Sequence, residues 1–269
     1  MKTLVKTLLD KPLLYKDPSY HKRIVLIDIE NMAHLIWAWE IYDTNAIEVE
    51  RAGHLLSMAY KYLGEKNTHV VALCDYKGYK PGSDDDKKLC EDIWKVLDGA
   101  DVIIGHNAQR FDIKKINYRF ILHGMEPTSP YKVVDTLTSL KRVAKAPSHK
   151  LDAIGKDMKI GRKIEHEGWA LWKKCHLGDP EAWAKMKKYN KQDVELLERW
   201  YLKLRPWITT HPNLNLILGG FTNCPRCHSE HIEKAGYNYT AVSIYQTYRC
   251  LNCGHRPQGE RIDRDRPLK

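Results

Sequence analysis

Asp28 and Glu30 are the side chains whose types and spacing most clearly suit metal chemistry. They close the apolar run 24–30, which predicts a strand buried on both faces. Alternate residues of a strand point to the same face, so both carboxylates leave it on one side. Two carboxylates at a buried strand end repel each other and are costly to desolvate unless a cation offsets them. The pair therefore indicates a divalent-metal site, with an ordinary strand that frays into a polar loop as the alternative.

Polar residues also follow a second apolar run. Residues 102–105 predict another short buried strand, and His106, Asn107, Phe111 and Asp112 come directly after it. We expect Asn107 to orient this segment or to contact a substrate phosphate, and His106 to contact substrate. Phe111 is expected to lie in the core. Asp112 adds a third carboxylate at the end of a buried strand.

A long amphipathic helix is predicted over residues 180–204, because apolar residues recur there at three- and four-residue steps. Asp179 is its expected N-cap. Asp193 lies in the middle of the apolar stripe, and Tyr189 lies one turn earlier on the same side. A carboxylate on an apolar stripe needs a partner, which a metal at the first strand would supply.

These segments together resemble a known family. The patterns D-x-E at 28–30, N-x-x-x-F-D at 107–112 and Y-x-x-x-D at 189–193 are similar to the three motifs of the DEDD 3′–5′ exonucleases, and the tyrosine marks the DEDDy branch. The resemblance covers roughly residues 22–205 and is strongest to the stand-alone ribonuclease H-like exonucleases of bacteria and phages. The stretches 133–136 and 150–154 also fit; Asp135 is interpreted as a structural residue that caps the next helix.

The resemblance implies an α/β fold with a ribonuclease H-like mixed sheet flanked by helices. It implies hydrolysis of phosphodiester bonds from a 3′ end with two catalytic Mg²⁺ or Mn²⁺ ions. It further implies that Tyr189 positions the attacking water. The metal ligands that it implies are Asp28, Glu30, Asp112 and Asp193.

The expected substrate is nucleic acid, and single-stranded DNA is favoured over RNA. A site that reads phosphates leaves no base-reading signature in one chain, so the sequence does not separate the two. Two alternatives stay open: a nucleic-acid-binding adaptor with a decayed nuclease domain, and a ribonuclease H-like endonuclease. The intact set of acids counts against the first, and the Y-x-x-x-D helix counts against the second.

The charge of the chain suits a polyanionic partner. The formal net charge is +10 and the pI is about 9.1, and basic residues are concentrated between 141 and 163. Lys150 and Lys163 in this segment are candidate substrate-binding residues, with a solvated helical face as the alternative. Trp169 and Trp172 could stack on bases, but their three-residue spacing favours the core.

Four of the seven cysteines form two C-x-x-C pairs near the C-terminus. Two such pairs at this spacing predict a zinc ribbon, in which four thiolates hold one structural Zn²⁺ in a closed site. The thiolate ligands would be Cys224, Cys227, Cys250 and Cys253. His228, His231 and His255 are alternative ligands, and a redox C-x-x-C is the alternative chemistry. The ribbon would bind nucleic acid or dock a replication or repair protein.

The predicted organisation is a lead-in of residues 1–22, an exonuclease domain of residues 23–205, a linker of residues 206–221 and the zinc ribbon of residues 222–269. No apolar stretch is long enough to span a membrane, and the cysteine usage and charged N-terminus indicate the cytoplasm. The resemblance implies that this is the cytoplasm of a bacterial cell or phage-infected host. A short helix is expected within the lead-in. Further strands are expected at 35–42, 55–63, 69–76, 101–105, 131–135 and within 239–249, although the pattern of 55–63 would equally fit a helix. Further helices are expected from the acids of 83–86 to Gly99 and at 109–123.

Overall fold

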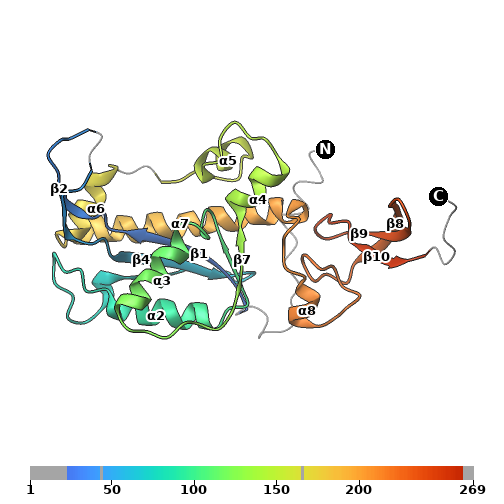
Figure 1. Cartoon of the computed structure of the whole chain (residues 1–269), viewed down its shortest axis with the longest axis horizontal. Coiled ribbons are helices and arrows are strands. Elements are labelled where there is room, and N and C mark those ends of the chain that lie inside the picture. The colour runs from blue at the N-terminus through green and yellow to red at the C-terminus, as the bar shows by residue number, and fades with distance from the viewer. Residues whose placement is uncertain (1–22, 43–44, 165–166, 263–269) are drawn as a thin grey trace.

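The structure is a computed structural model that describes residues 23–42, 45–164 and 167–262 (Figure 1). The helix expected within residues 1–22 lies outside the described residues. None of the described helices has both the length and the apolar character needed to cross a membrane.

A mixed five-stranded sheet with the order β5-β4-β1-β6-β7 forms the centre of the molecule. The central strand β1 pairs antiparallel with β4 and parallel with β6, and β6 pairs parallel with β7. The predicted mixed sheet is therefore confirmed. Its strands are β1 (Ile24–Asn31), β4 (Leu55–Tyr62), β5 (His69–Ala72), β6 (Val102–Gly105) and β7 (Lys132–Asp135).

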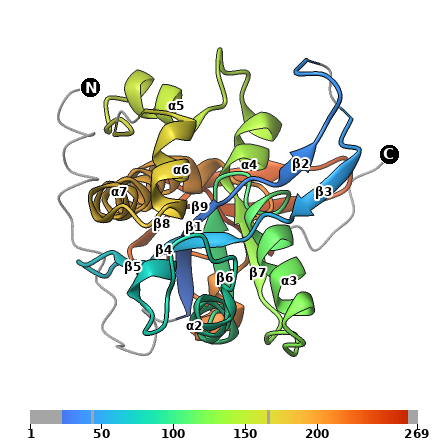
Figure 2. The ribbon, with the colours of Figure 1, turned by 90° about the vertical axis from the view of Figure 1, so that its left-hand side faces the viewer.

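Helices cover both faces of this sheet (Figure 2). On one side α2 and α3 pack against Val25, Ile27 and Ile29 of β1. On the other side α4, α5 and the second half of α7 pack against Ile24 and Leu26. The helices are α2 (Lys87–Asp98), α3 (Asp112–Leu122), α4 (Thr136–Val143), α5 (Leu151–Asp157), α6 (Trp169–His176) and α7 (Pro180–Leu204).

The helix α7 belongs to both cores. Met186 and Tyr189 belong to the same apolar cluster as residues of α2 and α3, whereas Val194 and Trp200 belong to the cluster that contains Ile24 and Leu26. Asp179 caps the helix as predicted, because its carboxylate accepts a hydrogen bond from the Glu181 N–H at 2.9 Å. The apolar stripe of α7 thus contributes to both apolar cores.

Two of the predicted strands are shorter than expected. In the segment 35–42 only β2 (Leu35–Trp37) is a strand, and it pairs with β3 (Glu48–Arg51), which the sequence did not predict. Both strands are largely exposed, so neither carries the apolar alternation that burial imposes. The strand predicted at 69–76 ends at Ala72 and continues as the 3₁₀ turn η2 (Leu73–Asp75).

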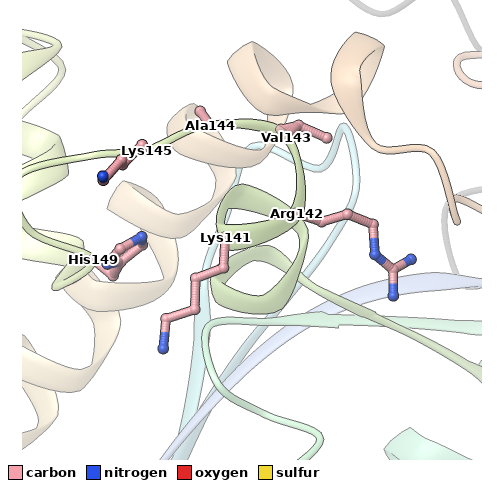
Figure 3. Close-up of a pocket in the computed structure, with 6 residues that line it drawn as sticks. All are labelled: Lys141, Arg142, Val143, Ala144, Lys145 and His149. Carbon is pink, nitrogen blue, oxygen red and sulfur yellow. The ribbon is translucent and has the colours of Figure 1, made fainter.

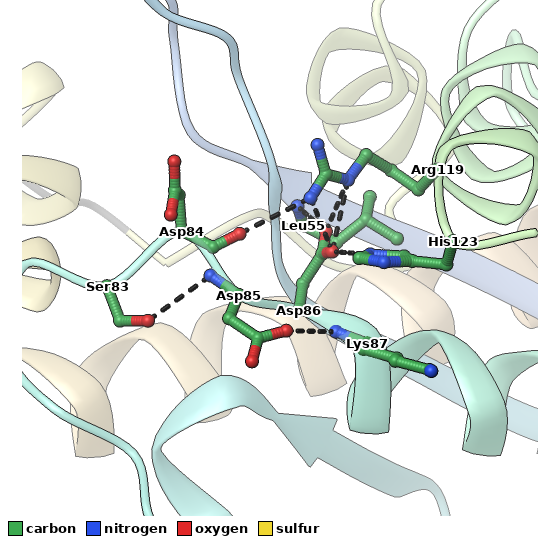
Figure 4. A network of polar contacts seen from close by, with 8 residues as sticks. All are labelled: Leu55, Ser83, Asp84, Asp85, Asp86, Lys87, Arg119 and His123. Atoms are coloured by element: carbon green, nitrogen blue, oxygen red, sulfur yellow. Dashed lines mark hydrogen bonds and ion pairs between the residues drawn. The ribbon is translucent and has the colours of Figure 1, made fainter.

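Asp86 is a buried anion rather than a capping residue. The prediction placed the acids of 83–86 in the first turn of a helix, but α2 begins at Lys87 and the Asp86 side chain makes no capping bond. Its carboxylate instead accepts hydrogen bonds from the Leu55 N–H at 2.8 Å, from Arg119 Nη2 at 2.6 Å and from His123 Nε2 at 2.6 Å (Figure 4). Burial alone would raise the pKa of Asp86, but the bonds from Arg119 and His123 lower it.

The segment predicted as a linker contains two short helices, η3 (Arg205–Trp207) and α8 (Leu214–Leu218). Ile208 and Leu214 are buried in the core that contains the second half of α7. A small antiparallel sheet with the order β10-β9-β8 follows. Its strands are β8 (Ile232–Tyr239), β9 (Ile244–Cys250) and β10 (Gln258–Arg261), so the strand expected within 239–249 is confirmed only from Ile244.

The buried His211 should make stability depend on pH. Burial lowers the pKa of His211 to about 3, and the charges of Arg226 and Arg205 lower it as well, although the bond to the Pro212 carbonyl at 2.7 Å raises it. An unfolded histidine takes up a proton below about pH 6.5, whereas the folded one does not until far lower pH. As pH falls through this window, the wild type should lose roughly 1.4 kcal/mol per pH unit from this group. The variant His211→Gln lacks this group, so its free energy of unfolding should not show this pH-dependent loss.

Urea denaturation of both proteins between about pH 7.5 and 4.5 measures this difference. The stability advantage of wild type over His211→Gln should shrink steadily on acidification. An advantage that stays constant with pH would show that folding does not hold His211 neutral.

Candidate active site

Three of the predicted acidic residues converge beside the central strand. Asp28 and Glu30 on β1 and Asp193 on α7 each offer a carboxylate oxygen, and these atoms lie within 4.8 Å of one another. Asp28 is partly buried, whereas Glu30 and Asp193 are 8% and 1% exposed. The strand places the first two on the face that α7 covers. Asp193 therefore meets them from the helix.

Asp112 lies next to this cluster at the start of α3. Its Oδ1 accepts a hydrogen bond from the Ile29 N–H at 3.1 Å, between the two acids of β1. Burial raises the pKa of Asp112 to about 6, although that bond lowers it. The negative charge of Asp112 also raises the pKa of Asp28. The structure thus brings all four predicted acids together.

The cluster is electrostatically unfavourable without cations. Burial raises the pKa of Asp28, and the charges of Glu30 and Asp193 raise it further. Burial likewise raises the pKa of Glu30 to about 8, with Asp193 as the next cause. Carboxylate oxygens are the ligands that Mg²⁺ and Mn²⁺ prefer. This donor set therefore fits divalent ions of that kind.

Lys163 supplies a positive charge inside the cluster. Its ammonium group forms an ion pair with Asp193 and donates a hydrogen bond to the Tyr189 hydroxyl at 3.2 Å. Burial alone would lower the pKa of Lys163, but Asp193 and Asp28 raise it. Tyr189 itself is buried beside Trp172, with ring centroids 6.2 Å apart. Lys163 was predicted to bind substrate, and the structure places it among the acids.

A polar contact beneath Asp28 was not predicted. The Asn190 side chain is fully buried and donates a hydrogen bond to Asp28 Oδ2 at 2.8 Å and another to the Asp28 carbonyl oxygen at 3.1 Å. Its own oxygen accepts a bond from the Ser57 hydroxyl at 3.0 Å. Asn190 therefore orients the Asp28 carboxylate. The available signal was an amide on the buried face of a helix, where an apolar residue is the rule.

Asp135 organises the loop that leads to Asp112. Its carboxylate accepts bonds from the Asn107 N–H at 3.1 Å and the Gln109 N–H at 3.2 Å, and it also caps α4 as expected. Asn107 has φ of 70°, in the left-handed region that asparagine tolerates better than most residues. The loop therefore delays the helix predicted from 109, which begins at Asp112.

The remaining predicted residues of this region lie at different depths. Phe111 is 43% exposed, so the prediction that it belongs to the core is wrong. Trp172 packs against the core, whereas Trp169 is 53% exposed. Lys150 is exposed immediately before α5. His106 is held by Thr136 Oγ1 at 2.9 Å and by the His149 carbonyl at 2.8 Å, so its ring joins two loops.

The four predicted cysteines form a second cluster, at the small sheet. Their sulfur atoms lie within 4.8 Å of one another and all four residues are buried. The cluster therefore suggests a structural zinc site. His228 is bonded to the Gly219 carbonyl at 2.8 Å, and His255 lies 3.3 Å from the Pro206 carbonyl. These histidines thus have backbone partners outside the cluster.

Comparison with known proteins identifies the larger part of the chain. Residues 59–205 match the sequence profile of the RNase_H superfamily. The chain belongs to this superfamily. The matched residues include Asp112, Tyr189 and Asp193, and the predicted ribonuclease H-like fold is confirmed.

A solved structure supports the same fold. This ribonuclease H-like chain is similar to the family B DNA polymerase from the hyperthermophilic archaeon Pyrobaculum calidifontis, with a TM-score of 0.50 and 11% sequence identity. The similarity covers 82% of this chain and 31% of the polymerase chain. No curated protein matches the sequence.

Proposed function

We propose that the chain is a metal-dependent 3′–5′ exonuclease that acts on single-stranded nucleic acid, with DNA favoured over RNA. The observation that carries this proposal is the convergence of four carboxylates from β1, α3 and α7, with Tyr189 one turn before Asp193. The RNase_H superfamily fold supports a phosphodiester hydrolase. The finer assignment comes from the D-x-E, N-x-x-x-F-D and Y-x-x-x-D patterns.

In this proposal Asp28, Glu30, Asp112 and Asp193 would hold two ions of Mg²⁺ or Mn²⁺. Bound divalent ions would polarise the phosphate and lower the pKa of the attacking water. The chain supplies the orientation of the ligands, because Asn190 fixes Asp28 and the Ile29 N–H fixes Asp112. Bound cations would relieve the mutual repulsion of the acids, which together with burial raises the pKa of Asp28 and of Glu30.

Tyr189 orients the water rather than removing its proton. Burial raises the pKa of Tyr189, with the Asp193 charge as the next cause, so the hydroxyl stays protonated at neutral pH. A protonated hydroxyl can donate to or accept from the water, but it is a poor base. Lys163, which bonds both Tyr189 and Asp193, would contact the scissile phosphate in this proposal.

The division of the chain is also a proposal. Residues 23–205 would form the nuclease domain and residues 222–269 a zinc ribbon that binds nucleic acid or a replication or repair protein. Arg23, next to the start of β1, donates a hydrogen bond to the Ile217 carbonyl at 2.8 Å, so the segment before the ribbon contacts the end of β1 opposite Glu30. A strand rises about 3.3 Å per residue. The ribbon therefore lies at the end of β1 remote from the acids.

End-labelled oligomers test the proposed activity. With Mn²⁺, a 5′-labelled single strand should give a ladder that shortens from the 3′ end, and a 3′-terminal phosphate should impede it. EDTA should stop the reaction, and Mg²⁺ or Mn²⁺ should restore it without added zinc. Cuts in a circular single strand would favour an endonuclease. Binding without any cleavage of DNA or RNA would favour an adaptor.

The variant Tyr189→Phe should lower kcat by roughly 10-fold to 1000-fold and leave KM almost unchanged, because it removes only the hydroxyl that orients the water. The ring contact with Trp172 would persist, so the fold should be retained. Steady-state kinetics on a single-stranded oligomer measure both constants. Tyr118→Phe, at an exposed tyrosine of α3, is the matched control. Unchanged kcat in Tyr189→Phe would make Tyr189 a packing residue.

A further inference from the structure

The end of α4 and the loop that follows it border an open pocket of about 500 Å³. Figure 3 shows Lys141, Lys145 and His149 on one side of it and Arg142 directed to the other. Every charged or titratable side chain that lines the pocket is basic. A pocket with this lining suits an anion. The lining residues are Lys141, Arg142, Val143, Ala144, Lys145 and His149.

One residue of the pocket lining, His149, is tied to the edge of the sheet that carries the acids. His106 Nε2 donates a hydrogen bond to the His149 carbonyl at 2.8 Å, and His106 directly follows β6. Since β6 runs parallel to β1 with Ile104 beside Leu26, His106 lies at the level of Asp28. The other ring nitrogen of His106 lies 2.9 Å from Thr136 Oγ1, at the start of α4. One imidazole therefore ties the rim of the pocket to the edge that carries the acids.

The pocket also lies on the same face of the sheet as the acids. Asp28 lies two residues after Leu26 on β1 and so points to the same face, and Leu26 packs in one core with Leu140 of α4 and Leu151 of α5. These two helices flank the segment that lines the pocket. A nucleic-acid strand whose 3′ end lies at the acids can therefore reach the pocket without crossing the sheet.

We infer that this pocket binds a backbone phosphate of the substrate strand, on the 5′ side of the bond that is cleaved. The inference rests on the proposed function and adds a second contact point for the same strand. Lys141 and Lys145 supply positive charge, and the His149 ring supplies a hydrogen-bonding group. Contacts of this kind hold a strand in register and read no sequence. A nucleic-acid strand held at both the acidic cluster and the pocket would stay aligned with the acids between successive cleavages.

The double variant Lys141→Gln/Lys145→Gln tests the inference on single strands of about 2 to 20 nucleotides. On long strands KM should rise about 10-fold with kcat unchanged, because only binding remote from the reacting atoms is lost. The effect should fade as the strand becomes too short to reach the pocket. The slope of log KM against log salt should decrease by about 0.7 per lost phosphate contact.

The matched control is Lys66→Gln/Lys87→Gln, which removes the same charge from exposed positions at the loop after β4 and on α2. It should behave as wild type at every length. Lys141→Arg/Lys145→Arg should restore the affinity, and thermal melting should show that all variants are folded. Equal effects at all lengths, or none on long strands, would overturn the inference and leave the proposed function intact.

Fluorescence anisotropy of a labelled strand separates the two proposals. Weaker binding by Lys141→Gln/Lys145→Gln, with normal binding by Lys66→Gln/Lys87→Gln, supports the pocket even if the protein cleaves no nucleic acid. In that case only the proposed function fails. Equal affinity of this variant and wild type overturns the pocket.

Discussion

The variants Asp28→Asn and Asp193→Asn should each reduce hydrolysis by about 1000-fold or more. Both carboxylates belong to the acidic cluster, and divalent-ion catalysis is worth several kcal/mol of transition-state stabilisation, at about 1.4 kcal/mol for each factor of ten. The fold should be retained, because a neutral amide relieves the repulsion that raises the pKa of Asp28. Nuclease assays with Mn²⁺ measure the loss.

Thermal melting gives a second measure that does not depend on turnover. Mn²⁺ should raise the Tm of the wild type, since it binds the folded state only, and should raise the Tm of either variant much less. Asp84→Asn removes one exposed carboxylate from the loop before α2 and is the matched control. If either cluster variant cleaves at a rate near that of wild type, the assignment of the metal ligands is wrong.

The variant Cys250→Ser should lose its zinc and unfold the small C-terminal sheet. Structural zinc in four-thiolate sites contributes about 10–16 kcal/mol of binding free energy in comparable peptides, and so small a sheet has little other core. The described apolar residue that packs on the cysteine cluster is Ile232. Elemental analysis should find about one zinc per wild-type chain and none in the variant. Limited proteolysis should cut the variant within β8 to β10.

Activity on short oligomers should survive this loss, because the segment before the ribbon contacts the end of β1 opposite the acids. Binding of long strands should weaken. Cys74→Ser, at a thiol outside the cluster, should keep both zinc and stability. If the nuclease domain of Cys250→Ser stays folded but does not cleave short oligomers with Mn²⁺, the ribbon is part of the active site.

Periodicity made the main elements predictable. The unbroken apolar run of β1 and the stripe of α7 are imposed by burial, so both appear in the sequence with the acids already placed on them. The cysteine cluster was predictable because tetrahedral thiolate ligation fixes the spacing of its ligands.

Features that depend on single long-range contacts could not be predicted in this way. Lys163 contacts Asp193 from a segment that is neither helix nor strand. Such a segment has no sequence periodicity from which the direction of a side chain could be predicted. Asp86 resembled a helix start because its partners, Arg119 and His123, are distant in sequence. Asn190 was not singled out in the sequence, because only the packing of α7 on β1 brings its side chain to Asp28.

The order of the elements along the chain has a consequence for synthesis on the ribosome. Asp28 and Glu30 are made early on β1, whereas Asp193 arrives on α7, which packs on both β1 and β4. A nascent chain that lacks α7 therefore has only part of the acidic set, on a sheet whose second face is covered only by α4 and α5. Larger proteins often form partly folded states while they are being made. Here such states lack Asp193, so the acidic cluster is complete only when α7 packs on the sheet.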